Sequence, residues 1–236
     1  MIILALDSTA KAAAVALLRD GELIAKDMHD DGNTHSSTLL PMVERLLKDN
    51  SLTVCDIDLF AASAGPGSFT GVRIGAATLK GLAFGKNKPC VPVSALEALA
   101  YNMRGESGIV CALMDARRGQ FYTATFEVNG GEVKRLTPDE AKSGEDIAAS
   151  LEKYDKVYLV GDGAEVAKPF FGDNAVLAPS DKLLADGESV GVLGIKLYKN
   201  GVGVSDAEFA PTYLRLPQAE RERLEKLKKD TPPASF

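Results

Sequence analysis

The hydrophobic pattern of the chain shows two similar halves. In the first half, an apolar run over residues 2–6 ends at Asp7, and a second run over residues 13–18 leads to an Asp-Gly turn. In the second half, residues 109–114 form an apolar run that ends at Asp115, and an alternating strand and an Asn-Gly-Gly turn follow. Because Asp-Gly and Asn-Gly tolerate the positive φ angles of hairpin turns, each half is predicted to begin with a strand, an aspartate and an antiparallel hairpin.

Helices and further strands are predicted after each hairpin. Apolar residues recur at helical spacing in four segments, namely residues 38–47, 71–84, 145–154 and 189–199. Apolar runs at residues 57–62 and 157–160 are predicted to be strands between these helices. The pattern therefore indicates an α/β protein with a duplicated architecture, in which each of two lobes is a mixed sheet flanked by helices.

The glycine-containing residues 104–108 are the predicted junction between the lobes. This divides the chain into an N-terminal lobe (1–105), a C-terminal lobe (106–216) and a tail (217–236). In the tail, acidic and basic residues alternate with few apolar ones, which is typical of a solvated terminal helix. The alternative is a segment that becomes ordered against a partner or RNA.

Composition narrows the classes of function. The 236 residues carry a formal net charge of −6, which argues against free-standing, non-specific binding to nucleic acid, so any RNA contact must be local or shared with a more basic partner. No apolar run approaches the ~20 residues that cross a bilayer, and a cytoplasmic location is expected. The three cysteines, Cys55, Cys90 and Cys111, fit neither a disulfide framework nor a zinc cluster and are predicted to lie in or near the core.

The glycine-rich stretch over residues 63–75 follows a predicted strand and opens a helix, an arrangement that favours anions. Gly65 and Gly67 would let the backbone approach a ligand, but the Gly-Lys-Ser/Thr ending of a P-loop is missing. Gly71 and Gly75 share one helix face, where close packing inside the protein or across an interface is favoured over phosphate binding.

Asp7, followed by Ser8, has two interpretations of equal weight. Its carboxylate could hold a hydrated Mg²⁺ beside a nucleotide phosphate, or it could accept hydrogen bonds from its own turn. The candidate nucleotide-binding residues are therefore Asp7, Ser8, Gly65 and Gly67. Asp115 with Arg117 and Arg118 has the same two interpretations, of which the structural one is favoured.

Metal and hydrolase sites find little support. His29 and His35 lie in a polar region without a nearby cysteine and are not spaced as a metal pair. Neither a Gly-x-Ser-x-Gly elbow nor a Cys/His pair is present. The prediction is that the chain holds no metal.

Five stretches together resemble the bacterial TsaB (YeaZ) family, and Gly-Pro-Gly-Ser-Phe-Thr-Gly-Val-Arg is the most specific of the motifs. These stretches are residues 3–9, 35–41, 65–75, 115–122 and 210–215. The resemblance implies the actin-like, Hsp70-like and sugar-kinase-like (ASKHA) fold. It also implies pairing with the catalytic TsaD subunit to make N6-threonylcarbamoyladenosine (t6A) at position 37 of tRNAs that read codons starting with A. Further implied partners are the ATPase TsaE and the enzyme that supplies threonylcarbamoyl-adenylate, with tRNA bound through the complex.

One departure from the catalytic relative determines the expected role. Where TsaD carries a His-x-x-x-His metal pair, this chain aligns Ala95 and Leu99. The resemblance therefore implies a non-catalytic scaffold or activator with no catalytic residues and no cofactor of its own. The rival functions are a self-sufficient ATP-dependent phosphotransferase and a metallopeptidase.

The family pairs through its first-lobe helices, with itself or with TsaD. The residues that this implies for the interface are Leu39, Leu40, Val43, Leu47, Gly71, Val72, Gly75 and Leu79. Packing of the same residues on their own sheet is the alternative, and residues outside the buried stripe are the better candidates. ATP or ADP held at the partner interface remains an open alternative.

Overall fold

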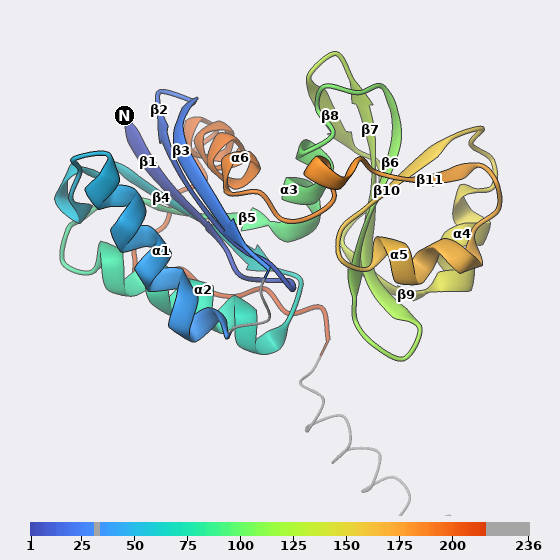
Figure 1. Ribbon diagram of the computed structural model, residues 1–236, viewed down its shortest axis with the longest axis horizontal. Helices are drawn as coiled ribbons and strands as arrows, with labels where there is room; N and C mark the ends of the chain where they lie inside the picture. The colour runs from blue at the N-terminus through green and yellow to red at the C-terminus, as the bar shows by residue number, and fades with distance from the viewer. Residues whose placement is uncertain (31–33, 216–236) are drawn as a thin grey trace, which may run out of the picture.

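The computed structural model describes residues 1–30 and 34–215, which form two lobes placed side by side (Figure 1). The first lobe contains a five-stranded sheet in the order β3-β2-β1-β4-β5. Its strands are β1 (Ile2–Asp7), β2 (Ala13–Arg19), β3 (Glu22–His29), β4 (Leu59–Gly65) and β5 (Cys90–Ser94). β1 pairs antiparallel with β2 and parallel with β4, so that Leu4 lies between Leu17 and Phe60.

Helices cover both faces of the first sheet, which explains why β1 is a continuous apolar run. On one face lie α1 (His35–Asp49) and α2 (Phe69–Ala83), packed against Leu4 and Leu6. On the other face, α6 (Gly187–Lys199) packs against Ile3 and Ala5. Alternate side chains of β1 point to opposite faces of the sheet and therefore belong to two different apolar clusters.

The second lobe repeats the arrangement. Its strands are β6 (Gly108–Asp115), β7 (Gln120–Asn129), β8 (Glu132–Arg135), β9 (Glu140–Ser143), β10 (Val157–Val160) and β11 (Ala175–Leu177). The order is β11-β10-β6-β7-β8, with β9 also paired to β7. As with β1, the central strand β6 has an antiparallel hairpin partner on one side and a parallel strand on the other. This repetition confirms the predicted duplicated α/β architecture.

The helices of the second lobe lie around this sheet. α4 (Gly144–Leu151) and α5 (Ala164–Ala167) pack on one face, and α3 (Ala95–Tyr101) packs on the other, between the lobes. The described part of the chain also contains three short 3-10 helices, η1 (Val54–Asp56), η2 (Lys168–Phe170) and η3 (Ser180–Lys182).

The predicted helices and strands are found, with shifted ends. The strand predicted at residues 157–160 is β10 without a shift, whereas the helix predicted from residue 71 begins at Phe69. The earlier start has a local cause, because the Ser68 side chain accepts a hydrogen bond from the Gly71 N–H and caps the helix. The tail over residues 217–236 lies outside the described residues, so its predicted helix stays a prediction.

Packing crosses the predicted division of the chain at residue 105. α6 lies in the segment 106–216, yet it packs on the first sheet, and Phe209 is buried in the cluster beneath α1 and α2. The division at residue 105 separates the two sheets along the sequence, but α6 and Phe209, which come after it, pack in the first lobe.

The cysteine prediction holds for Cys90 and Cys111, which are buried, and is wrong for Cys55, which is exposed in η1. Within residues 1–30 and 34–215, no helix combines the length and the apolar character needed to cross a membrane.

Candidate functional site

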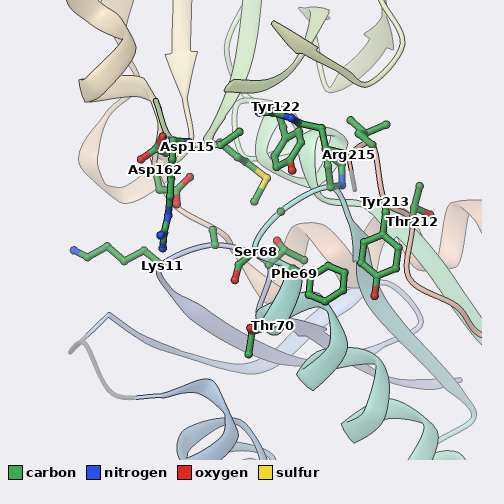
Figure 2. Close-up of a pocket in the computed structure, with 18 residues that line it drawn as sticks. Lys11, Ser68, Phe69, Thr70, Asp115, Tyr122, Asp162, Thr212, Tyr213 and Arg215 are labelled. Carbon is green, nitrogen blue, oxygen red and sulfur yellow. Dashed lines mark hydrogen bonds between the residues drawn. The ribbon is translucent and has the colours of Figure 1, made fainter. Parts of the chain in front are cut away.

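A cavity of about 500 Å³ lies where the β1–β2 loop, the β6–β7 turn, the start of α2 and the C-terminal segment meet (Figure 2). Lys11, Asp115 and Asp162 lie on one side of it, and Arg215, Tyr122 and Tyr213 lie on the other. The remaining lining residues are Thr9, Ala10, Pro66, Gly67, Ser68, Phe69, Thr70, Met114, Ala116, Arg117, Thr212 and Leu214. Both lobes thus contribute to one polar cavity.

Asp7, the expected centre of a nucleotide site, does not line this cavity. Its carboxylate is only 2% exposed, and Oδ1 accepts hydrogen bonds from the Thr9 N–H (2.8 Å) and the Thr9 hydroxyl (2.7 Å). Oδ2 accepts one from the Ser63 hydroxyl at 2.5 Å. Burial raises the pKa of Asp7, although these hydrogen bonds act to lower it. Of the two interpretations of Asp7, the geometry favours the acceptor in its own turn.

Ser8 is also buried within the fold. Its hydroxyl donates to the carbonyl of Gly71 at 2.9 Å. A Cβ added to Gly71 would collide with the Ser8 carbonyl, and a Cβ on Gly75 would lie 2.6 Å from Ser8 Oγ. The Ser8 turn of the same chain therefore approaches both glycines, with its backbone at Gly71 and its side chain at Gly75, which confirms close packing inside the protein.

Gly65 and Gly67 are required by the fold. Both have positive φ, +120° and +158°. A Cβ on Gly65 would collide with the Thr212 carbonyl, and one on Gly67 with the Thr9 carbonyl. Of the four candidate nucleotide-binding residues, the structure places only Gly67 in the cavity wall.

Asp162 lies between the hairpin loops of the two lobes. Its Oδ1 is buried and has no hydrogen-bond partner among the described residues. Burial raises the pKa of Asp162, and the neighbouring backbone N–H groups of Asp115 and Lys11 lower it only in part. A carboxylate at this position repels a second anion, so phosphate groups are disfavoured beside Asp162 itself.

The interface prediction needs correction for seven of its eight residues. Leu39, Val43, Leu47, Val72 and Leu79 are at most 5% exposed because they pack on the first sheet, and Gly71 and Gly75 face the Ser8 turn. Only Leu40 remains on the surface, at 52% exposure. For these seven residues the alternative interpretation holds, because they belong to the buried stripe of their helix.

The two positions that the resemblance led us to expect opposite a metal pair lie in α3. Ala95 and Leu99 are 1% and 3% exposed and pack in the apolar cluster between α3 and the second sheet. Among the described residues, no group of three or more potential metal ligands converges. Ala95 and Leu99 serve the joint between the lobes.

Most lining residues of the cavity were not predicted. Tyr213 and Arg215 belong to the C-terminal segment, which the backbone hydrogen bond from the Thr212 N–H to the Ala64 carbonyl (2.7 Å) holds beside the glycine-rich loop. No periodic pattern signals such a long-range contact. Arg117 did stand in a segment that the sequence analysis named, the Asp115 turn.

The chain is similar in sequence and in structure to proteins of known family. The family model described as tRNA N6-adenosine threonylcarbamoyltransferase (TsaD) matches residues 30–222. The tRNA threonylcarbamoyladenosine biosynthesis protein TsaB of Bacillus subtilis is 32% identical over 243 residues, covering 97% of this chain and 100% of the relative. TsaB of Escherichia coli is 32% identical over 223 residues, covering 91% and 95%. The structure of YeaZ from Pseudomonas aeruginosa superposes with a TM-score of 0.79 at 30% identity, covering 90% of this chain and 99% of the other.

Proposed function

The chain belongs to the TsaB (YeaZ) family, and from this membership we propose that it is a non-catalytic subunit in the synthesis of threonylcarbamoyladenosine in tRNA. In this proposal it pairs with a TsaD-type threonylcarbamoyltransferase, acts with a TsaE-type ATPase in the cytoplasm, and serves tRNAs that read codons starting with A. The observation that carries the proposal is the match to TsaB proteins over 91–97% of the chain.

The placement of Ala95 and Leu99 supports the non-catalytic part of the proposal. Both side chains are apolar and are buried between the lobes, so neither of them can bind a metal ion. The engagement of both Asp7 oxygens by Thr9 and Ser63 likewise counts against a self-sufficient phosphotransferase.

The outer face of α1 and α2 is the proposed partner surface. Leu40 projects from α1 at 52% exposure, and Phe84, directly after α2, is 76% exposed. Large apolar side chains that remain exposed on neighbouring helices are candidates for protein–protein contacts. A stable pairing through this face is expected to bury roughly 1,200–2,000 Å² in total.

Gly81 gives independent support for this surface. It lies inside α2, is exposed, and a Cβ added to it would meet no atom within 4 Å. A helical glycine costs about 1 kcal/mol relative to alanine, and the fold of this chain gives no reason for it. Close approach of a partner backbone would give one. A second copy of this chain is the alternative occupant of the same face.

The test is reconstituted tRNA modification by the TsaD-type enzyme and its other partners, with and without this chain. Threonylcarbamoyladenosine is expected only when the chain is present, and Asp7→Asn is expected to leave product formation unchanged. Equal product without the chain would refute the subunit role. Loss of product with a folded Asp7→Asn variant, together with ATP turnover by the isolated chain, would instead support the phosphotransferase.

A further inference from the structure

Two consecutive arginines occupy a backbone conformation that arginine rarely adopts. In the β6–β7 turn, Arg117 has φ +66° and Arg118 has φ +57°, followed by Gly119 at +69°. Glycine, asparagine and aspartate are the usual residues at such positions, because other side chains crowd the backbone there. Backbone strain of this kind concentrates at functional sites.

The Arg117 side chain makes no polar contact that would stabilise the described part of the fold. The Arg117 backbone N–H donates to Asp115 Oδ1 at 2.7 Å, but the guanidinium makes no hydrogen bond or ion pair with any residue that the structure describes. The residue nevertheless lines the cavity between the lobes. The residues that the structure describes therefore make no use of the side chain at this strained position.

Two further cations reach the same cavity from distant parts of the sequence. Lys11 comes from the β1–β2 loop and is paired with Asp30 at 3.1 Å, with its side chain 66% exposed. Arg215 comes from the C-terminal segment, and its guanidinium has no ion pair within residues 1–30 and 34–215. The chain as a whole has a net charge of −6, so a cavity lined by three cationic side chains differs from the acidic character of the rest of the protein.

The carboxylates of the cavity do not cancel this charge by direct pairing. Asp115 accepts the Arg117 backbone N–H, and Asp162 lies by the backbone N–H groups of Lys11 and Asp115. Neither carboxylate forms an ion pair with Arg117 or Arg215 among the described residues. As far as residues 1–30 and 34–215 are concerned, the guanidinium groups thus remain available to an anionic ligand.

Aromatic rings complete the lining. Phe69, Tyr122 and Tyr213 border the cavity, and the rings of Phe69 and Tyr213 lie 4.9 Å apart. Ser68 and Thr70 add hydroxyl groups. Cations beside aromatic faces are the means by which proteins hold unpaired nucleotides of RNA, with the phosphate on the cation and the base on the ring.

We propose that this cavity binds a phosphate-bearing, unpaired nucleotide of the tRNA, with Arg117 contacting its phosphate and an aromatic face receiving its base. The inference rests on the proposed function, which brings the chain and a tRNA into one assembly. A free nucleotide such as ATP or ADP shares this chemistry, so the test must separate the two sources.

The experiment measures RNA binding by the complex of this chain with its TsaD-type partner, using a fluorescently labelled anticodon stem–loop at several salt concentrations. Arg117→Asn removes the cation and places in the turn a residue that tolerates positive φ. The affinity of the Arg117→Asn complex for RNA is expected to fall several-fold. The slope of the logarithm of the binding constant against the logarithm of the salt concentration is expected to become less steep by about 0.7, for one lost phosphate contact. Its melting temperature is expected to be equal to or higher than that of the parent.

Lys134→Asn is the matched control, because it removes an exposed cation from β8, outside the cavity lining. It should leave the affinity and the salt slope unchanged. ADP and ATP are tested alone by calorimetry and as competitors of the RNA, where the expected result is no competition.

Three results would overturn the inference while leaving the proposed function intact. The first is an Arg117→Asn complex that forms normally and binds RNA with parental affinity and slope. The second is an equal effect of Lys134→Asn, which would show that only total charge matters. The third is binding of ADP or ATP that depends on Arg117 and displaces the RNA, which would assign the cavity to a free nucleotide. Failure of the complex to form, or modification without this chain, would instead refute the proposed function.

Discussion

The hydroxyl of Ser8 donates a hydrogen bond to the backbone carbonyl of Gly71 at 2.9 Å, and this contact fixes the turn after β1 against the first turn of α2. The two residues are 63 positions apart and belong to the two motifs that suggested ligand binding. The absence of a side chain at Gly71 lets the backbone of the Ser8 turn lie directly on the helix. One of the most family-specific stretches of the sequence therefore serves internal packing.

The first prediction concerns the glycines beneath this turn. Gly71→Ala places a Cβ against the Ser8 backbone carbonyl, which cannot move without the turn, and is expected to lower the free energy of unfolding by about 3 kcal/mol. Gly75→Ala meets only the Ser8 side chain, which can rotate away at the cost of one hydrogen bond, about 1 kcal/mol. Urea unfolding of both variants checks the order. Equal losses would contradict the assignment of the Gly71 contact to the backbone.

The second prediction concerns Gly81, which is an exposed residue of α2. Gly81→Ala is expected to raise the free energy of unfolding of the isolated chain by about 1 kcal/mol, because alanine is the better helix former and meets no neighbour. The same variant is expected to weaken binding to the TsaD-type partner, measured by calorimetry. A gain in stability with unchanged binding would remove the close-approach argument for this face.

The architecture was predictable because its central strands carry long apolar runs. β1, β6 and β10 are almost wholly buried between helices, so their sequences read as strands without context. α3 was missed for a physical reason. It has only seven residues and follows directly on β5. A segment this short does not show a helical repeat of apolar residues clearly enough to distinguish it from a continuation of the strand.

The candidate site was predictable only as a region. The sequence identified the glycine-rich loop and the two aspartates that end β1 and β6, and the structure brings the loops after these strands to one cavity. The sequence could not show that Asp7 turns inward to Thr9 and Ser63, nor that Arg215 returns to the cavity. The Asp7–Ser63 hydrogen bond and the return of Arg215 both depend on contacts between residues far apart in the chain.

The third prediction concerns Asp7. Asp7→Asn keeps an oxygen that can accept from Thr9 and removes a buried charge, so it is expected to be at least as stable as the parent at neutral pH. Asp7→Ala leaves the donors of Thr9 and Ser63 without an acceptor and is expected to lose about 1–3 kcal/mol.

The pH dependence gives this prediction a second readout. Burial raises the pKa of Asp7 above its ordinary value of 3.8, so the folded protein holds this proton more tightly than the unfolded chain. Stability contributed by the protonated group is therefore lost as the pH rises above 3.8. The advantage of Asp7→Asn over the parent should grow through this range and level off above the raised pKa. Urea unfolding at a series of pH values checks it, and a constant difference would contradict the raised pKa.

The last prediction concerns Arg135, whose guanidinium joins α3 to the second sheet. Nη2 donates to Glu97 at 3.0 Å and to the Ser94 hydroxyl at 3.1 Å, and Nη1 pairs with Asp139. The guanidinium also lies over the Phe126 ring, 4.7 Å from its centroid. Because one planar fork serves two carboxylates, lysine cannot reproduce the arrangement.

Arg135→Ala is expected to lower the free energy of unfolding by about 1–3 kcal/mol, since Glu97 and Asp139 lose their shared cation. Arg135→Lys should recover only part of this loss. The neighbouring exposed Lys134 offers a matched control, and Lys134→Ala should change stability by less than about 0.5 kcal/mol. Chemical unfolding of the three variants decides the point. If Arg135→Ala were as mild as Lys134→Ala, the joint between the lobes would depend on the apolar packing of α3 alone, and the ion pairs would contribute nothing to it.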